Sequence, residues 1–279
     1  MRTHIDNIVQ YFAGERNIDV SMYDEGYVWK TVQKRMLACG CNDAAEYISL
    51  LRLHTDEASQ LLRQLVNTWT EFFRDPLAFA YLEYVTLPIL RDELRNRTPG
   101  GIRAWSAGCS TGQEAWSLAV LLEELSAERG ERVPYHLFAT DNADDALAAA
   151  RKAVYDISAA GELRLRHVGH LLVRVQDQLH VAPALREHVT IEHYDLLDPH
   201  SLCPPSCVFG DLDLVLCCNL LMYYRSDIRH IILGKIHRCL SPTGYLMVGN
   251  AEREIVLSSG YFKSVCPYIP LFQPYLERS

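Results

Sequence analysis

A turn of small residues, followed one strand later by an acid, is the most informative pattern in this 279-residue sequence. The segment Arg103–Trp116 predicts a short buried strand, a turn from Ala107 to Gly112, and the start of a helix. Such a turn brings backbone N–H groups close to a ligand and aims the helix N-terminus at it. A second strand-like run, Tyr135–Thr140, is followed by Asp141. This combination is typical of a nucleoside site in a doubly wound sheet.

The residues of the turn distinguish between three kinds of ligand. A phosphate-binding P-loop needs a lysine where Gln113 stands. A dinucleotide fingerprint needs three spaced glycines and an acid about 20 residues later, whereas Asp141 lies 29 residues after Gly112. S-adenosylmethionine, a nucleoside without phosphate, fits what remains. Asp141 would accept hydrogen bonds from its ribose and Glu114 from its ammonium group. A tight turn without any ligand stays open as the alternative.

Composition and charge set the broad class. The chain is 49% hydrophobic, which is enough for a full core, and its net charge of −8 argues against an overall nucleic-acid-binding surface. No apolar run reaches ~18 residues and the N-terminus lacks a signal peptide, so we expect a cytoplasmic protein without membrane insertion.

The nine cysteines and eleven histidines do not indicate a metal site. The cysteines lack the paired C-x-x-C spacing of zinc sites, and the histidines form no close ligand pattern. We therefore expect reduced thiols and no metal. Redox or metal chemistry at Cys203 and Cys207 is the less favoured interpretation.

The first 95 residues predict helices only. Asn42 and Asp43 are expected to cap one of them, and Pro76 suits a first helical turn. The loop Arg97–Gly101 marks a domain boundary. The expected helices are Ile5–Phe12, Tyr27–Leu37, Ala44–Leu53, Asp56–Phe73 and Pro76–Leu94.

From Ile102 onward, strand and helix patterns alternate, which predicts an α/β fold with a mostly parallel sheet and helices on both faces. A small hairpin, Leu171–Val175 with Leu179–Ala182, is inserted, and the tail Tyr261–Tyr275 is expected to add two strands. The expected core strands are Ile102–Ser106, Tyr135–Thr140, Val189–His193, Leu212–Cys217 and Tyr245–Gly249. The expected helices are Gln113–Arg129, Asp144–Lys152 and Ser226–Cys239.

Several motifs together resemble the CheR-type chemoreceptor methyltransferases, which methylate glutamate side chains with S-adenosylmethionine. The T-x-F-F-R and C-x-N-x-x-x-Y motifs are distinctive in combination, and the resemblance covers nearly the whole chain. Cys218 stands where the family usually has Arg, Gln113 where Glu is frequent, and Asn250 where His is frequent. The resemblance is carried by Thr70–Asp75, Trp105–Glu114, Ala139–Asp141, Cys218–Tyr224, Leu240–Tyr245 and Gly249–Glu252.

The resemblance implies a Rossmann-like class I methyltransferase domain, with a mostly parallel seven-stranded sheet and a small antiparallel β insertion, preceded by an all-helical domain. We therefore expect a helical domain over residues 1–75, a linker helix and loop over 76–101, and the methyltransferase domain over 102–279, with a small β subdomain around 168–188.

Matching motif positions also implies which residues contact the cofactor. Thr70 and Arg74 would do so from the linker side. Asp195, where the family usually has Asn, would lie with Leu196 beside the adenine, unless Asp195 merely caps its own turn. The complete set is Thr70, Arg74, Ala107, Gly108, Glu114, Asp141, Asp195, Leu196, Asn219 and Leu220.

Arg74 and Tyr223 are the expected catalytic residues. The side chain of a glutamate acceptor ordinarily titrates with a pKa of about 4.3 and is already ionised near neutral pH, so no general base is required. Because charge disappears during methyl transfer, a dry site favours the reaction. The expected task of Arg74 and Tyr223 is therefore to orient the acceptor.

We expect a protein-glutamate O-methyltransferase of chemotaxis signal transduction, with S-adenosylhomocysteine as product and the cytoplasmic helical bundle of a chemoreceptor as partner. The family docks through a basic helix face, but here Tyr27–Leu37 offers only Lys30, Lys34 and Arg35. Two alternatives stay open. One is a methyltransferase for another carboxylate or a small molecule, and the other is a non-catalytic module that binds S-adenosylmethionine or S-adenosylhomocysteine.

Overall fold

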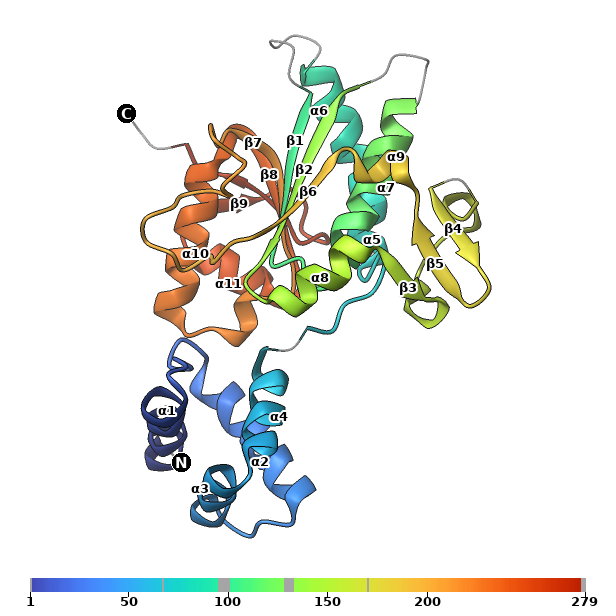
Figure 1. The fold of residues 1–279 in the computed structure, drawn as a ribbon. Helices are drawn as coiled ribbons and strands as arrows, with labels where there is room; N and C mark the ends of the chain where they lie inside the picture. The colour runs from blue at the N-terminus through green and yellow to red at the C-terminus, as the bar shows by residue number, and fades with distance from the viewer. Residues whose placement is uncertain (1, 67, 95–100, 128–132, 170, 277–279) are drawn as a thin grey trace. The chain divides into compact units, whose positions relative to one another are not determined.

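The computed structural model describes residues 2–66, 68–94, 101–127, 133–169 and 171–276 (Figure 1). The chain divides into two compact units, each with its own hydrophobic core. The helical unit comprises Met1–Thr68 and Met222–Arg229, and the α/β unit comprises Trp69–Leu221 and His230–Ser279. Within the described ranges, no helix is long and apolar enough to cross a bilayer.

Four helices build the helical unit around a core that includes Ile8, Phe12, Tyr47 and Leu61. Their ends follow local capping rules. The Asp43 carboxylate accepts hydrogen bonds from two amides of the first turn of α3, whereas Asn42 bonds to Glu46 and caps nothing. The helices are α1 (Arg2–Arg16), α2 (Glu25–Cys39), α3 (Ala44–Leu53) and α4 (Thr55–Val66).

A buried ion pair joins α2 to α4 in this unit. Arg35 Nε donates to Glu57 Oε1 at 2.8 Å, and the Tyr47 hydroxyl donates to the same oxygen at 2.7 Å. Burial alone would raise the pKa of Glu57, but the hydrogen bonds from Arg35 and Tyr47 bring it below its ordinary value. Because Arg35 is held inside, the predicted basic face of α2 keeps only Lys30 and Lys34.

The predicted helix Asp56–Phe73 is wrong at its C-terminal end, because α4 ends at Val66. Thr68 and Thr70 are β-branched and lower helix propensity. Phe73 has a left-handed backbone with φ of 50°, and its N–H donates to Ser117 Oγ rather than to a helical carbonyl. A tertiary contact therefore holds Phe73 outside any helix.

The α/β unit contains a seven-stranded sheet in the order β6-β2-β1-β7-β8-β10-β9. β1 pairs in parallel with both β2 and β7, and β10 is antiparallel to both of its neighbours. From β1 the chain first adds β2 and β6 on one side, and it then crosses to the other side of β1, where β7 and β8 follow. Ligands bind at such a switch point, beyond the carboxyl ends of the strands. The strands are β1 (Ile102–Ala107), β2 (Tyr135–Asp141), β6 (Val189–His193), β7 (Leu212–Cys217), β8 (Leu240–Val248), β9 (Phe262–Ser264) and β10 (Leu271–Pro274).

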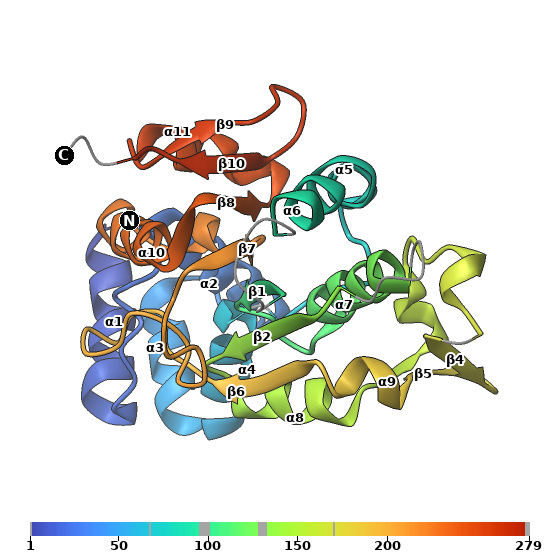
Figure 2. The same ribbon diagram turned by 90° about the horizontal axis from the view of Figure 1, so that it is seen from above.

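Helices cover both faces of this sheet. Figures 1 and 2 show α10 on one side and α6 with α7 on the other. Trp105 of β1 and Trp116 of α7 are the largest fully buried side chains. The helices are α5 (Pro76–Tyr81), a π-helical turn η1 (Leu82–Thr86), α6 (Leu87–Leu94), α7 (Gln113–Ala127), α8 (Asp144–Lys152), α9 (Pro183–Arg186), α10 (Ser226–Cys239) and α11 (Arg253–Ser258).

The insertion is a three-stranded antiparallel sheet in the order β3-β5-β4. The predicted hairpin is confirmed as β4 (Leu172–Val175) and β5 (Gln178–Val181), and β3 (Val154–Asp156) adds a third strand to the small antiparallel insertion. These elements and the parallel sheet confirm the predicted fold class.

Two predictions fall on residues that the structure does not describe. The predicted domain boundary at 97–101 falls mainly on residues 97–100, and the predicted helix Gln113–Arg129 ends on residues 128 and 129. Both lie outside the described residues. The domain limits at 75 and 101 stay predictions.

We predict that Glu57→Ala lowers the free energy of unfolding by about 3 kcal/mol, because it leaves Arg35 buried without its partner. Urea denaturation followed by circular dichroism measures this. The matched control is Arg52→Ala, which removes the exposed Arg52–Glu15 pair of the same unit and should cost less than ~1 kcal/mol. Equal costs for the two variants would contradict the buried-pair interpretation.

Candidate functional site

The turn after β1 is fixed to the end of β2 by its own backbone amides. The N–H groups of Gly108 and Cys109 both donate to the Thr140 carbonyl, at 2.9 and 2.8 Å, and the Ser110 N–H donates to Asp141 Oδ2 at 2.8 Å. These amides are used inside the protein, which corrects the prediction that they face a ligand. These three N–H groups are therefore not available to a phosphate.

Glycine is required at position 108 by backbone conformation. Gly108 has a φ of 78°, and a Cβ placed there would lie 3.0 Å from Leu220 Cδ1. Leu220, which follows β7, thus lies directly against the turn, next to the fully buried Ala107 at the end of β1. The structure brings these three predicted cofactor contacts together.

Asp141 is the last residue of β2, and each of its two carboxylate oxygens accepts one hydrogen bond from the backbone. Oδ2 accepts from Ser110 N, and Oδ1 accepts from Ala143 N at 3.0 Å. Each oxygen keeps a second lone pair for a hydroxyl donor. The Asp141 carbonyl accepts from Tyr194 N at the end of β6. Asp141 is therefore held rigidly in a geometry that suits a ribose diol.

Glu114 lies in the first turn of α7, and its Oε1 accepts from the Ser106 hydroxyl at 2.6 Å. Burial raises the pKa of Glu114 to about 7, and the neighbouring Glu252 carboxylate adds to the increase. Hydrogen bonds from Ser106 and Cys218, and the charge of Arg74, act in the opposite direction. A cationic ligand beside Glu114 would favour its ionised form.

Glu252 is a buried carboxylate whose place sequence reasoning missed. Its Oε2 accepts from Asn219 N at 2.7 Å and from Gly249 N at 2.8 Å, which ties the ends of β7 and β8 together. Asn219 has a left-handed φ of 58°, a conformation that Asn tolerates well. The spacing of Gly249 and Glu252 is that of a capping box and was the available signal.

The predicted site residue Arg74 packs on Trp69. Like Glu252, Trp69 was not predicted from the sequence. Arg74 Nη1 donates to the Trp69 carbonyl at 3.3 Å, and its guanidinium carbon lies 4.5 Å from the centre of the Trp69 ring. Thr70 lies in the same non-helical segment and is partly exposed. The charge of Arg74 lowers the pKa of Glu114, although less than the hydrogen bonds from Ser106 and Cys218 do.

Asp195 adopts the local role that was left open as an alternative. Its Oδ1 accepts from Leu197 N at 2.8 Å, and its carbonyl accepts from Asp198 N. The side chain is exposed and Leu196 is buried. This turn shapes the loop after β6, and contact of Asp195 and Leu196 with adenine stays a prediction.

Tyr223 belongs to the helical unit and not to the α/β unit that holds the other predicted residues. Its ring lies 4.7 Å from that of Tyr27, measured between centroids, and its carbonyl accepts from Asp24 N at 2.8 Å. The structure therefore gathers Arg74, Gly108, Glu114, Asp141 and Asn219 in one unit and places Tyr223 in the other.

The donor set of the α/β unit suits a cationic, phosphate-free nucleoside. Glu114, Asp141 and Glu252 supply carboxylates near the ends of β1, β2 and β8. Acids attract an ammonium or a sulfonium and repel a pyrophosphate. In the described ranges, no group of His, Cys, Asp and Glu side chains is arranged to hold a metal ion.

Two family models cover the chain. Residues 68–265 match the description "CheR methyltransferase, SAM binding domain", and residues 3–66 match "CheR methyltransferase, all-alpha domain". The chain belongs to the CheR methyltransferase family. This match confirms the predicted family, the helical N-terminal region and S-adenosylmethionine as the cofactor.

Named relatives are similar over most of the chain. The chemotaxis protein methyltransferase of Borreliella burgdorferi is 28% identical over 76% of this chain and 75% of its own length. That of Salmonella typhimurium is 26% identical over 89% and 83%. An uncharacterized 104.1 kDa protein of Rhodobacter capsulatus is 28% identical over 92% of this chain, which spans only 26% of that relative.

Among solved structures, a TehB-like SAM-dependent methyltransferase from Corynebacterium glutamicum aligns with a TM-score of 0.37 and 15% identity, over 66% of this chain and 86% of its own. A likeness this weak carries no argument about function.

We predict that Glu114→Gln stabilises the protein progressively as the pH rises. The folded-state pKa of Glu114 is about 7, above its ordinary value of 4.5, so wild-type stability falls as the pH rises from 4.5 through 7. The variant lacks this loss. Urea denaturation should show a difference near zero at pH 4 that grows to at most about 3 kcal/mol at pH 8. A difference that is independent of pH would contradict the burial of this carboxylate.

Proposed function

We propose that the protein is a cytoplasmic S-adenosylmethionine-dependent O-methyltransferase that forms methyl esters on glutamate side chains of chemoreceptor-type signalling proteins. Family membership and the relatives named chemotaxis protein methyltransferases support this proposal. The single observation that carries it is the grouping of two acids at the ends of the paired strands β1 and β2. Glu114 accepts from Ser106 of β1, and Asp141, which ends β2, accepts from the turn after β1.

The residues of the α/β unit would divide the work of binding and orientation. When bound, S-adenosylmethionine supplies the methyl group as an electrophile. Asp141 would hold the ribose hydroxyls and Glu114 the ammonium group, against a floor made by Gly108 and Leu220. Arg74, held on Trp69, would orient the acceptor carboxylate. That carboxylate is already ionised near neutral pH, so no residue has to remove a proton.

One observation favours a second candidate function, methylation of a different carboxylate acceptor. Arg35 is paired with the buried Glu57, so α2 offers only Lys30 and Lys34 to an acidic helical bundle. Up to residue 66, nine acids outnumber seven basic residues. Docking on a chemoreceptor is therefore less strongly supported than methyl transfer.

Radiolabelled S-adenosylmethionine, incubated with the protein and with membranes that carry chemoreceptors, tests the proposal. We expect label in a receptor-sized band that alkali releases as methanol, because methyl esters are labile to base. Label only in small molecules would favour the second candidate function. Cofactor binding without any transfer would contradict both and favour a non-catalytic binding module.

We predict that Arg74→Ala lowers kcat about 100-fold and Tyr223→Phe about tenfold, since misplacing the acceptor raises the barrier without unfolding the protein. The methyl-transfer assay measures both. Arg238→Ala, on the exposed side of α10, is the control and should stay within about twofold of wild type. Wild-type turnover by Arg74→Ala or Tyr223→Phe would rule out the assigned role of that residue.

We also predict that S-adenosylhomocysteine binds about tenfold more tightly at pH 8 than at pH 6, because its ammonium group requires ionised Glu114, whose pKa is about 7. Isothermal titration calorimetry measures the affinity and the proton release. In Glu114→Gln the affinity should be lower and lose this step between pH 6 and 8. The same pH step in the variant would exclude Glu114 as its origin.

A further inference from the structure

Phe73, the residue before Arg74, is held in an unusual conformation by contacts from three sides. Its backbone is left-handed, with φ of 50°, which a residue with a Cβ adopts only where its surroundings impose it. Its N–H donates to Ser117 Oγ at 3.0 Å. Its ring meets that of Phe79 edge-on, with centroids 5.2 Å apart, and stacks on the ring of His167 at 4.8 Å with an interplanar angle of 17°.

His167 is almost fully buried, at 1% exposure, although it lies in the insertion far from Phe73 in sequence. Arg166 Nε donates to its Nε2 at 3.2 Å, and Glu124 Oε2 of α7 lies 3.6 Å from the same nitrogen. Its Nδ1 has no hydrogen-bond partner in the described part of the chain. The protein therefore buries a polar ring whose principal contact is a flat stack on Phe73.

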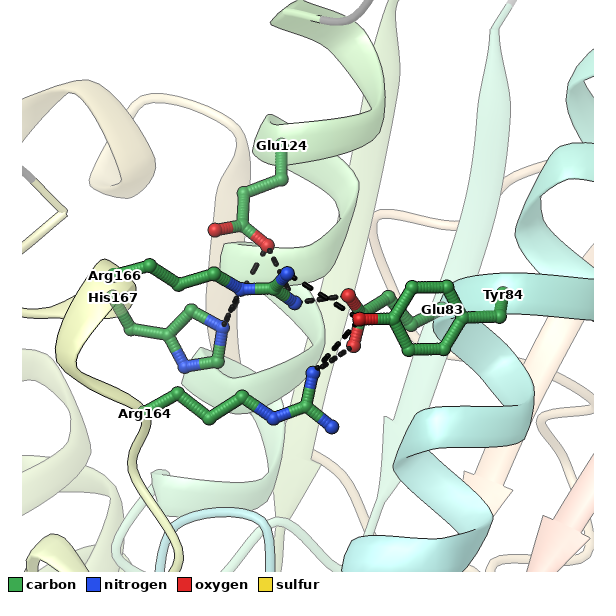
Figure 3. A network of polar contacts seen from close by, with 6 residues as sticks. All are labelled: Glu83, Tyr84, Glu124, Arg164, Arg166 and His167. Atoms are coloured by element: carbon green, nitrogen blue, oxygen red, sulfur yellow. Dashed lines mark hydrogen bonds and ion pairs between the residues drawn. The ribbon is translucent and has the colours of Figure 1, made fainter.

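Two arginines anchor the His167 segment to the helix that follows Arg74. Figure 3 shows Arg164 and Arg166 reaching across to Glu83, with the Tyr84 hydroxyl beside them. Arg164 Nη1 lies 2.7 Å from Glu83 Oε2 and donates to the Tyr84 hydroxyl at 3.2 Å, and Arg166 pairs with the other oxygen of Glu83. The Glu83 side chain is only 14% exposed, so this pairing is partly shielded from water.

Glu83 lies in the π-helical turn η1, which continues α5. Single π-helical turns are uncommon and often mark functional positions. α5 begins directly after Asp75, whose carboxylate caps it by accepting from Ala78 N at 3.2 Å. Arg74 thus lies between Phe73, which stacks on the His167 ring, and the start of α5. Glu83, further along in η1, keeps its pairing with Arg166 when Arg164 is removed.

We propose that His167, held in place by Arg166, is a positioning residue that sets the backbone at Phe73 and thereby aims Arg74 at the reacting groups. This inference rests on the proposed role of Arg74. Removing the stack would let Phe73 relax toward an ordinary backbone conformation. The guanidinium would then move, and a displacement of about 1 Å at a reacting centre costs up to about 100-fold in rate.

Variants at His167 and Arg164 separate positioning from general stability. His167→Ala and His167→Leu remove the flat stack, and the leucine variant keeps most of the side-chain volume. His167→Phe retains the stack without ring nitrogens. Arg164→Ala is the matched control, because it removes one arginine from Glu83 without touching His167. Thermal melts confirm that the assays run well below each unfolding midpoint.

Two measurements on the full chain test the proposal. In the methyl-transfer assay, His167→Ala and His167→Leu should lower kcat at least tenfold and change the KM for S-adenosylmethionine less than threefold, whereas His167→Phe and Arg164→Ala stay within about threefold of wild type. Hydrogen exchange should show the Phe73 amide protected in wild type, His167→Phe and Arg164→Ala, and at least tenfold less protected in the other two.

Either of two results would overturn the inference: unchanged Phe73 protection in both His167→Ala and His167→Leu, or failure of His167→Phe to restore turnover. If the wild-type protein transfers no methyl group, the proposed function fails. The exchange experiment still decides whether His167 fixes the backbone next to Arg74.

Discussion

The attachment of the β1–α7 turn to the end of β2 is the constraint on which the rest of the site depends. The Thr140 carbonyl accepts hydrogen bonds from two amides of the turn, and the Asp141 carboxylate accepts one from a third amide. These bonds fix where α7 starts and therefore where Glu114 lies. They also occupy three N–H groups that a phosphate could otherwise use. The same contacts thus hold the fold together at its switch point and favour a nucleoside without phosphate as the ligand.

Burial is the main influence on how readily Glu114 ionises at this edge of the sheet. The charge of Glu252 adds to the effect of burial in raising the pKa of Glu114, whereas the hydrogen bond from the Cys218 thiol lowers it. Burial, and then the charges of Glu114 and Glu252, raise the pKa of Cys218. Burial is the largest cause of the raised pKa of Glu114, and a cationic ligand beside it would favour its ionised form. The charge of Arg74 lowers the pKa of Glu114 to a smaller extent.

Much of the fold could be predicted from sequence because local rules agree with the tertiary structure. The predicted limits of Ala44–Leu53, Val189–His193, Leu212–Cys217 and Ser226–Cys239 are those observed. Capping residues and β-branched runs specify such elements locally. The non-helical conformation of Phe73 could not be predicted, because its N–H donates to a serine 44 residues away.

The acidic residues of the site could be predicted from the sequence, whereas the contacts that hold its basic residues could not. Asp141 follows from its place after a strand. The packing of Arg74 on Trp69 depends on the non-helical backbone between them, and the inward turn of Arg35 depends on Glu57, 22 residues away. Calorimetric titration with S-adenosylhomocysteine and with ATP tests the central claim most directly. The account predicts micromolar binding of S-adenosylhomocysteine and no detectable binding of ATP. Binding of ATP without binding of S-adenosylhomocysteine would contradict it.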